Sequence, residues 1–357
     1  MLEETNQPAA PETTDTPTNP GSEEVEQGGF SLWDRLRNPR TLVSFGIAIA
    51  IVIFAFRGLN INIQETWRYM RGANPWLLLT GFVVFYLTFP LRALRWRLLL
   101  ENANVPVQEG RKTWATLPAL IEYIYLSWFA NCIVPAKLGD AYRGYLLKHN
   151  GKVSFSATFG TIFAERLLDM IGLFAMLVVS GWFTFGAHMP EGTRIVFFFG
   201  GLLVVMILAG LAGMRWLGPV IRRFIPQRFL SFYTNFEQAA LRSFRPAILP
   251  RLILMTACVW VLEGFRLFFV IEALGQEGLN LSLSAIVFVA LASSLLTAMP
   301  LTPAGLGVVE GTITAVLILF GVTDTNLGSA VTLLDRLINF WSIVVFGFIL
   351  YLFSKRK

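Results

Sequence analysis

Long runs of apolar residues, separated by short polar segments, dominate the chain from about residue 41 to its end. A helix needs about 20 apolar residues to cross the hydrocarbon core of a bilayer. The pattern therefore predicts an all-α polytopic membrane protein. Six runs are predicted to cross the membrane completely, at 41–56, 75–94, 155–185, 194–217, 251–274 and 328–353.

Two more apolar regions, 113–147 and 283–320, do not fit as crossings once the cations are considered. Cytoplasmic segments are rich in Lys and Arg. This rule places the residues before 41, the regions 92–112 and 215–251, and the C-terminus inside, and the cation-free loops 186–193 and 275–280 outside. The assignments agree only if 113–147 enters and leaves on the inside and 283–320 on the outside. Both regions are thus predicted to be re-entrant helical hairpins, while Arg68 and Arg71 in the connector 57–74 fit the rule poorly.

The two predicted hairpins share a sequence motif. One reads "PAKLG" from Pro135 and the other "PAGLG" from Pro303, and the spans that follow carry "ERLLD" from Glu165 and "DRLIN" from Asp335. Two ordered matches at similar spacing indicate an internal duplication. Three predicted crossings separate the hairpins, and because three is odd the two copies form an inverted repeat, a plan common in transporters.

Charged residues inside these apolar segments are the candidate site. Each costs about 2.5–3.5 kcal/mol at the centre of an isolated membrane helix, so each needs a partner. Structural ion pairs that pin the hairpins to the spans, cation contacts to a substrate and a proton relay are all open interpretations, and Glu263 with Arg266 is predicted to form another buried pair. The candidates are Lys137, Asp140, Arg143, Glu165, Arg166, Asp169, Glu310, Asp335 and Arg336, with Pro135, Gly139, Pro303, Gly305 and Gly307 at the hairpin tips.

Composition separates the first thirty residues from the rest. The whole chain is 55% hydrophobic and only 15% charged, against about 25% charged in soluble domains. Residues 1–30 contain seven acidic residues and no basic one, which predicts a disordered acidic tail on the cytoplasmic side. Removing those seven charges from the net +6 leaves +13 on residues 31–357, the predicted membrane domain.

The surplus of cations favours anionic lipid headgroups as a partner and gives no reason to invoke nucleic acid. A basic amphipathic segment at 218–250 is predicted to bind such headgroups. Cys132 and Cys258 lie inside apolar runs and are predicted to be small packing residues. No cofactor or metal site is predicted, and the P-loop pattern of ATP-driven proteins does not occur in the sequence.

Four motifs in combination resemble the lysylphosphatidylglycerol synthase transmembrane-region family of flippase-like membrane proteins. They are "PAKLGDAYRGYLL", "AERLLD", "PLTPAGLGVVEG" and "LLDRLINF", and the likeness covers about residues 45–353. In bifunctional members this region precedes a soluble aminoacyltransferase domain and is thought to move the aminoacylated lipid between leaflets. The resemblance implies a stand-alone member that handles lipid without lysyl transfer, and it implies the two re-entrant hairpins.

The favoured hypothesis is a lipid translocase in the plasma (inner) membrane, with both termini cytoplasmic and an oligomer possible. Arg166 and Arg336 would coordinate the phosphate of a phospholipid or lipid-linked substrate, because the planar guanidinium binds two oxygens at once. Lys137 and Arg143 would attract the headgroup, and the carboxylates would hold the cations. An intramembrane lipid-modifying transferase and a non-transporting scaffold are the alternatives. The sequence assigns no catalytic residue, so an enzyme is not expected.

Overall fold

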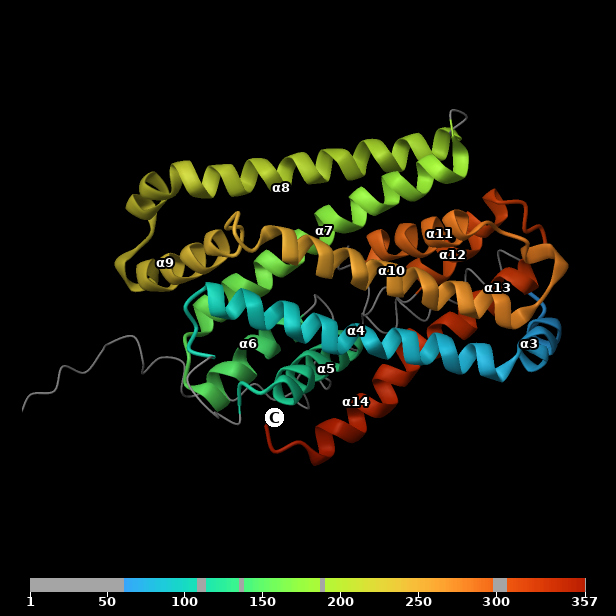
Figure 1. The fold of residues 1–357 in the computed structure, drawn as a ribbon, viewed down its shortest axis with the longest axis horizontal. Helices are drawn as coiled ribbons and strands as arrows, with labels where there is room; N and C mark the ends of the chain where they lie inside the picture. Colours follow the sequence, from blue (N-terminus) through green and yellow to red (C-terminus); the bar gives the residue numbers. More distant parts are fainter. Residues whose placement is uncertain (1–60, 108–113, 135–137, 187–189, 298–306, 357) are drawn as a thin grey trace, which may run out of the picture. The chain divides into compact units, whose positions relative to one another are not determined.

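The computed structural model describes residues 61–107, 114–134, 138–186, 190–297 and 307–356, and these residues form helices and connecting loops without a strand. The acidic tail, the run 41–56 and the tip residues Pro135, Lys137, Pro303 and Gly305 lie outside the described residues. In chain order the helices (Figure 1) are α3 Ile63–Gly72, α4 Pro75–Asn102, α5 Leu117–Ile133, α6 Leu138–Gly151, α7 Phe155–Phe185, α8 Glu191–Phe224, α9 Gln227–Arg242, α10 Leu249–Leu274, η1 Glu277–Leu279, α11 Leu283–Thr297, α12 Val308–Leu319, α13 Thr325–Arg336, the π-helical η3 Leu337–Trp341 and α14 Ser342–Phe353.

Four helical segments are long and apolar enough to cross a membrane. They are α4, α8, α10 and the continuous stretch Thr325–Phe353, which joins α13, η3 and α14. Helix α7 has 31 residues and is therefore about 46 Å long. The prediction of a polytopic α-helical membrane protein is confirmed. The number of six crossings stays a prediction, because the run 41–56 lies outside the described residues.

Two pairs of shorter helices occupy the predicted hairpin regions. Helix α5 packs against α6, and α11 packs against α12. The longest of the four has 17 residues, or about 26 Å at 1.5 Å per residue, whereas the hydrocarbon core is about 30 Å thick. Over the described residues each helix is shorter than the hydrocarbon core. The re-entrant hairpins stay a prediction, with which these lengths agree. A Cβ on Gly139 would lie 2.1 Å from the carbonyl oxygen of Ser127, so glycine permits the close approach of α6 to α5.

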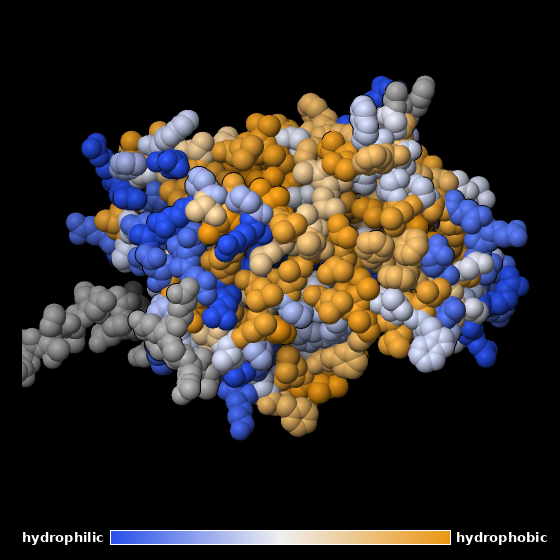
Figure 2. Space-filling model, viewed as in Figure 1, coloured by the Kyte–Doolittle hydropathy of each residue, from blue (hydrophilic) through white to orange (hydrophobic). Residues whose placement is uncertain are grey.

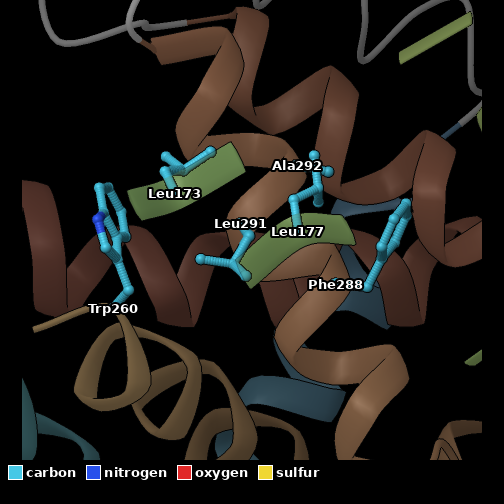
Figure 3. Close-up of a cluster of buried hydrophobic side chains, with 6 residues drawn as sticks. All are labelled: Leu173, Leu177, Trp260, Phe288, Leu291 and Ala292. Carbon is cyan, nitrogen blue, oxygen red and sulfur yellow. The ribbon is translucent and has the colours of Figure 1, made fainter. Parts of the chain in front are cut away.

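The second helix pair is held by an apolar cluster. Figure 3 shows side chains from α7, α10 and α11 lying together, and six of them are buried. Because α11 carries no charged residue, these apolar contacts account for its attachment to the long helices. The six are Leu173, Leu177, Trp260, Phe288, Leu291 and Ala292.

The exposed surface of the long helices is apolar. Figure 2 shows hydrophobic side chains over the middle of one face and hydrophilic ones gathered towards its two ends, as a bilayer would require. On α8 only Thr193, Gly200 and Gly218 are buried, so most of this helix is available to lipid. Cys132 is buried as predicted, but Cys258 is exposed. The packing role expected for Cys258 is wrong, because it lies on the outer side of α10 with Leu254.

The basic segment predicted at 218–250 consists of the last turns of α8, then α9 and the loop before α10. Helix α9 packs against α7 and α8. Arg222 is bound to Glu237, whose carboxylate is almost completely buried, at 2.9 Å. Arg223, Arg228 and Arg245 are exposed. Part of the basic charge therefore stabilises the contact between α8 and α9, and part faces outward.

The connector 57–74, in which Arg68 and Arg71 fit the charge rule poorly, contains α3. This ten-residue amphipathic helix docks on the start of α13. The Tyr69 hydroxyl donates to Asp324 at 2.7 Å, and the backbone N–H of Asn62 donates to Asn326 at 2.7 Å. The hydrogen bond to the Asp324 carboxylate raises the pKa of Tyr69 above its ordinary value. These polar contacts tie the connector to the protein, so Arg68 and Arg71 belong to a docked helix rather than a free loop.

Candidate functional site

Six arginines and six carboxylates meet inside the helical bundle, and we call this set the charged centre. Ten of the twelve residues are buried, while Arg166 and Glu310 are partly exposed. Each arginine contacts at least one carboxylate of the set within 4 Å. The members are Arg92, Arg95, Arg143, Arg166, Arg266 and Arg336, with Asp140, Glu165, Asp169, Glu263, Glu310 and Asp335.

The first half of the charged centre is built around Arg95 of α4, whose side chain is completely buried. Arg95 contacts Glu165 at 2.9 Å and Asp169 at 2.6 Å, both on α7, and donates to the Thr256 hydroxyl of α10 at 2.8 Å. Glu165 and Asp169 are one helical turn apart, so a single guanidinium reaches both. On its other oxygen Glu165 contacts Arg143 of α6 at 2.7 Å. Ion pairs thus join α4 and α6 to α7, and a hydrogen bond joins Arg95 to α10.

Helix α6 is attached to α7 by a second, bidentate contact. Arg166 donates from Nε to one oxygen of Asp140 at 2.7 Å and from a terminal nitrogen to the other at 2.6 Å. This fork-to-fork geometry is the strongest form of the arginine–carboxylate pair. The side chain of Asn131 on α5 accepts from the Gly139 backbone N–H at 2.9 Å, which fixes the start of α6. The position of Asp140 is therefore set by both helices of the first pair.

The second half repeats this arrangement with fewer charges. Arg266 of α10 contacts Asp335 of α13 at 2.7 Å. Arg336 of α13 contacts Glu310 of α12 through Nε at 2.8 Å and through a terminal nitrogen at 3.4 Å. Glu310 also accepts from the backbone N–H of Gly307, the residue before α12, at 2.6 Å. The side chain of Asn339 donates to Asp335 at 2.8 Å.

The two halves meet at one ion pair between α4 and α10. Arg92 contacts Glu263 at 3.0 Å, and Glu263 contacts Arg266 on its own helix at 3.3 Å. The guanidinium of Arg92 also lies over the ring of Trp128, 4.8 Å from its centre. Arg92 is thereby held between the partner helix α10 and the first helix of the neighbouring pair, α5.

Among the residues that the structure describes, the charged centre is electrically balanced, with six positive and six negative side chains. Balance matters because a buried charge without a partner costs several kcal/mol. The two bidentate pairs differ in exposure: the Arg166 side chain is 30% exposed and the Arg336 side chain 7%. Within the described ranges no group of three or more His, Cys, Asp and Glu is placed to hold a metal ion. Arg166 is therefore the cation of the set that an external anion can reach most easily.

The structure brings most of the predicted site residues together, in two groups. Asp140, Arg143, Glu165, Arg166 and Asp169 are joined by the ion pairs of the first half. Glu310, Asp335 and Arg336 belong to the second half, where the predicted pair of Glu263 and Arg266 is also present. Lys137 lies outside the described residues.

Two residues of the charged centre were not expected from the sequence. The second crossing is predicted to end at residue 94 with Arg92 and Arg95 at its exit, but α4 continues to Asn102 and both arginines are buried. Their predicted place on the cytoplasmic side stays a prediction. They extend the buried stripe of Phe85 and Thr88 at helical spacing, whereas Arg97 lies off it and is 39% exposed. That spacing is the signal that separates the buried arginines from their exposed neighbour.

Known proteins resemble this chain over much of its length. Residues 41–347 match the family described as "Lysylphosphatidylglycerol synthase TM region". A UPF0104 membrane protein of Methanocaldococcus jannaschii is 36% identical over 64% of this chain and 95% of its own length, and one of Pyrococcus horikoshii is 23% identical over 88% and 97%. The glycosyltransferase AglD of Haloferax volcanii is 22% identical over 76% of this chain and 48% of its own length.

Proposed function

Because the chain belongs to the lysylphosphatidylglycerol synthase transmembrane-region family, we propose that it moves an anionic lipid between the leaflets of the plasma membrane. The lipid is a phospholipid or a lipid-linked substrate with a phosphate in its headgroup, and both termini are cytoplasmic. One observation carries the proposal: each short helix pair is attached to a long helix by a bidentate arginine–carboxylate contact within an apolar bundle.

The chemistry of these contacts suits a phosphate. A guanidinium that presents two N–H groups to a carboxylate presents the same fork to two phosphate oxygens. Asp140 thus occupies the place that a headgroup phosphate would take on Arg166. Because the Arg166 side chain is 30% exposed, we expect the lipid phosphate to replace Asp140 there first. In the resting protein the carboxylate keeps the cation paired, which makes an empty buried site tolerable.

The second bidentate contact serves the opposite leaflet in this proposal. Arg336 and Glu310 repeat the geometry of Arg166 and Asp140, but their side chains are only 7% and 13% exposed. A phosphate reaches Arg336 only after α12 has moved away from α13. The two re-entrant hairpins then open in turn, one to each leaflet, as in other transporters built from inverted repeats.

A lipid-modifying transferase is the second candidate, because one relative is named a glycosyltransferase. The matched region is 48% of that protein. A transferase needs an acid or base directed at the substrate, whereas each carboxylate of the charged centre contacts an arginine. The contacts therefore favour translocation, and a chemically altered lipid is kept as an outcome of the test.

The test uses the purified protein in liposomes that contain a fluorescent phospholipid. The fraction of probe that a membrane-impermeant quencher destroys rises above the one-leaflet value if lipid crosses the membrane. Three variants are compared with the wild type: Arg166→Gln, the double variant Asp140→Asn/Arg166→Gln, and Arg223→Gln as a control in an exposed arginine at the end of α8. Lipid extracts are analysed in parallel by mass spectrometry.

The double variant separates substrate binding from a purely structural ion pair. It removes both charges, so it should fold as stably as the wild type, yet it should lose at least tenfold in the rate of lipid movement because the phosphate ligand is gone. Arg223→Gln should retain the wild-type rate. A double variant that moves lipid at the wild-type rate would assign the Asp140–Arg166 pair to structure alone. A wild type whose quenched fraction stays at the one-leaflet value, or a modified lipid in the extract, would overturn translocation.

A further inference from the structure

Most residues of the charged centre recur along the chain at an offset of 170 or 171 positions. Arg95 and Arg266 are 171 positions apart, Asp140 and Glu310 are 170 apart, and Glu165 and Asp335 are 170 apart. Arg166 and Arg336, and Asp169 and Asn339, also differ by 170. Nearly equal offsets in three pairs of helices indicate that the repeat extends well beyond the hairpin motif and includes α4 and α10.

The contacts repeat with the residues. The pairs Asp140–Arg166 and Glu310–Arg336 each join residues 26 positions apart. Arg95 contacts Glu165 on α7 at 2.9 Å, and Arg266 contacts Asp335 on α13 at 2.7 Å. The offset also makes α9 the counterpart of α3 and α13 the counterpart of α7. In agreement, α3 docks on α13 and α9 docks on α7. Equal contacts at equal offsets are what two copies of one structural unit produce.

One ion pair differs from the other described pairs of the charged centre, because its two members are equivalent to each other. Arg92 and Glu263 are 171 positions apart and contact each other at 3.0 Å. A two-fold rotation exchanges equivalent positions, so two equivalent residues in contact must lie on either side of the rotation axis. Helices α4 and α10, which carry them, pack against each other.

We infer that the Arg92–Glu263 pair lies on the pseudo-two-fold axis and is a positioning pair that sets the register of the two halves. Identical residues on a two-fold axis face each other, and two arginines or two glutamates there would repel. The chain has opposite charges at this one place, so the duplicated halves attract across the axis. Both side chains are at least 92% buried, which makes the attraction strong. The inference concerns the architecture and does not depend on the proposed function.

The symmetry gives a specific test. Exchanging the two residues has the same effect on the pair as the two-fold rotation, because each residue then occupies the equivalent position in the other half. In Arg92→Glu/Glu263→Arg the new glutamate is followed three positions later by Arg95, as Glu263 is followed by Arg266 in the wild type. Each single variant places like charges together and should lower the thermal unfolding midpoint in detergent by more than 10 °C, or prevent folding. The double exchange should recover more than half of that loss.

A matched control exchanges an ion pair that does not straddle the axis. Arg95 and Asp169 are as close, at 2.6 Å, and as buried, but their equivalents are Arg266 and Asn339 rather than each other. Arg95→Asp/Asp169→Arg should therefore recover little. Equal recovery of the two exchanges, or none at Arg92 and Glu263, would overturn the inference. The unfolding midpoint needs no lipid movement, so this result is separate from the transport test.

Discussion

The sharpest expectation concerns two arginines only two positions apart on α4. The Arg95 side chain is completely buried and contacts Glu165 and Asp169, whereas Arg97 is 39% exposed and contacts Glu101 one turn away. Removing one partner of a buried ion pair costs about 3–5 kcal/mol, because the other charge stays buried without compensation. An exposed pair one turn apart contributes about 0.3–0.5 kcal/mol.

The structure indicates which carboxylate loses most of its charge compensation when Arg95 is replaced. Glu165 keeps its contact with Arg143 at 2.7 Å. Asp169 keeps one described ion pair, a longer contact with Arg166 at 3.9 Å. Arg95→Gln should therefore lower the free energy of unfolding by about 3–5 kcal/mol, and adding Asp169→Asn should return most of it.

The measurement is equilibrium unfolding in mixed detergent micelles, on titration with a denaturing detergent. Arg97→Gln serves as the control, since it removes the same side chain from the same helix. About 1 kcal/mol is the upper end of the range for an exposed pair. If Arg95→Gln falls within that amount of Arg97→Gln, the buried network does not stabilise the protein as argued. Failure of Asp169→Asn to restore stability would remove the assignment of the cost to that carboxylate.

Three further expectations concern other parts of the protein. Gly139→Ala should lower the unfolding midpoint, because its Cβ would meet a carbonyl of α5 at 2.1 Å, while Gly210→Ala, with open space around it, should not; equal midpoints would contradict the close helix approach. Tyr69→Phe removes the hydrogen bond to Asp324 that raises the pKa of Tyr69. The stabilisation from this bond is present below the ordinary tyrosine pKa of about 10 and is lost as the pH rises through the raised pKa. Stability measured against pH should show the wild type and this variant converging in alkali, and a constant gap would count against the bond. Arg228→Gln, exposed at the start of α9, should weaken retention of anionic lipid about fivefold, since a basic residue near the surface contributes about 1 kcal/mol; quantification of co-purified lipid checks this.

Several features could be predicted from the sequence because they leave a local signature. Hydrophobic length predicts the long helices, and the repeated Pro-Ala-x-Leu-Gly motif marks the two shorter helix pairs. The acidic–arginine motifs from Glu165 and Asp335 predict charges inside the bundle, and the structure pairs them with α6 and α12. A charge inside an apolar run is visible without any knowledge of tertiary structure, because its insertion cost demands a partner.

Other features depend on how far a helix continues and on which neighbour it meets. Arg92 and Arg95 follow an apolar run that is already long enough to cross, so length alone places them in the headgroup region. The packing of α5, α7 and α10 against α4 buries them. The contact of Arg92 with Glu263 joins residues 171 positions apart, and no local pattern predicts a contact at that distance.

The equal numbers of arginines and carboxylates in the charged centre have an electrical consequence. Charge that moves across a membrane experiences its potential, at about 2.3 kcal/mol per elementary charge per 100 mV. A rearrangement that moves each arginine together with its carboxylate transfers no net charge, so voltage does not drive such a motion directly. The headgroup of a translocated anionic lipid is then the charge that feels the potential. Imposed voltages in liposomes should accordingly bias the direction of lipid movement and leave the empty protein unaffected.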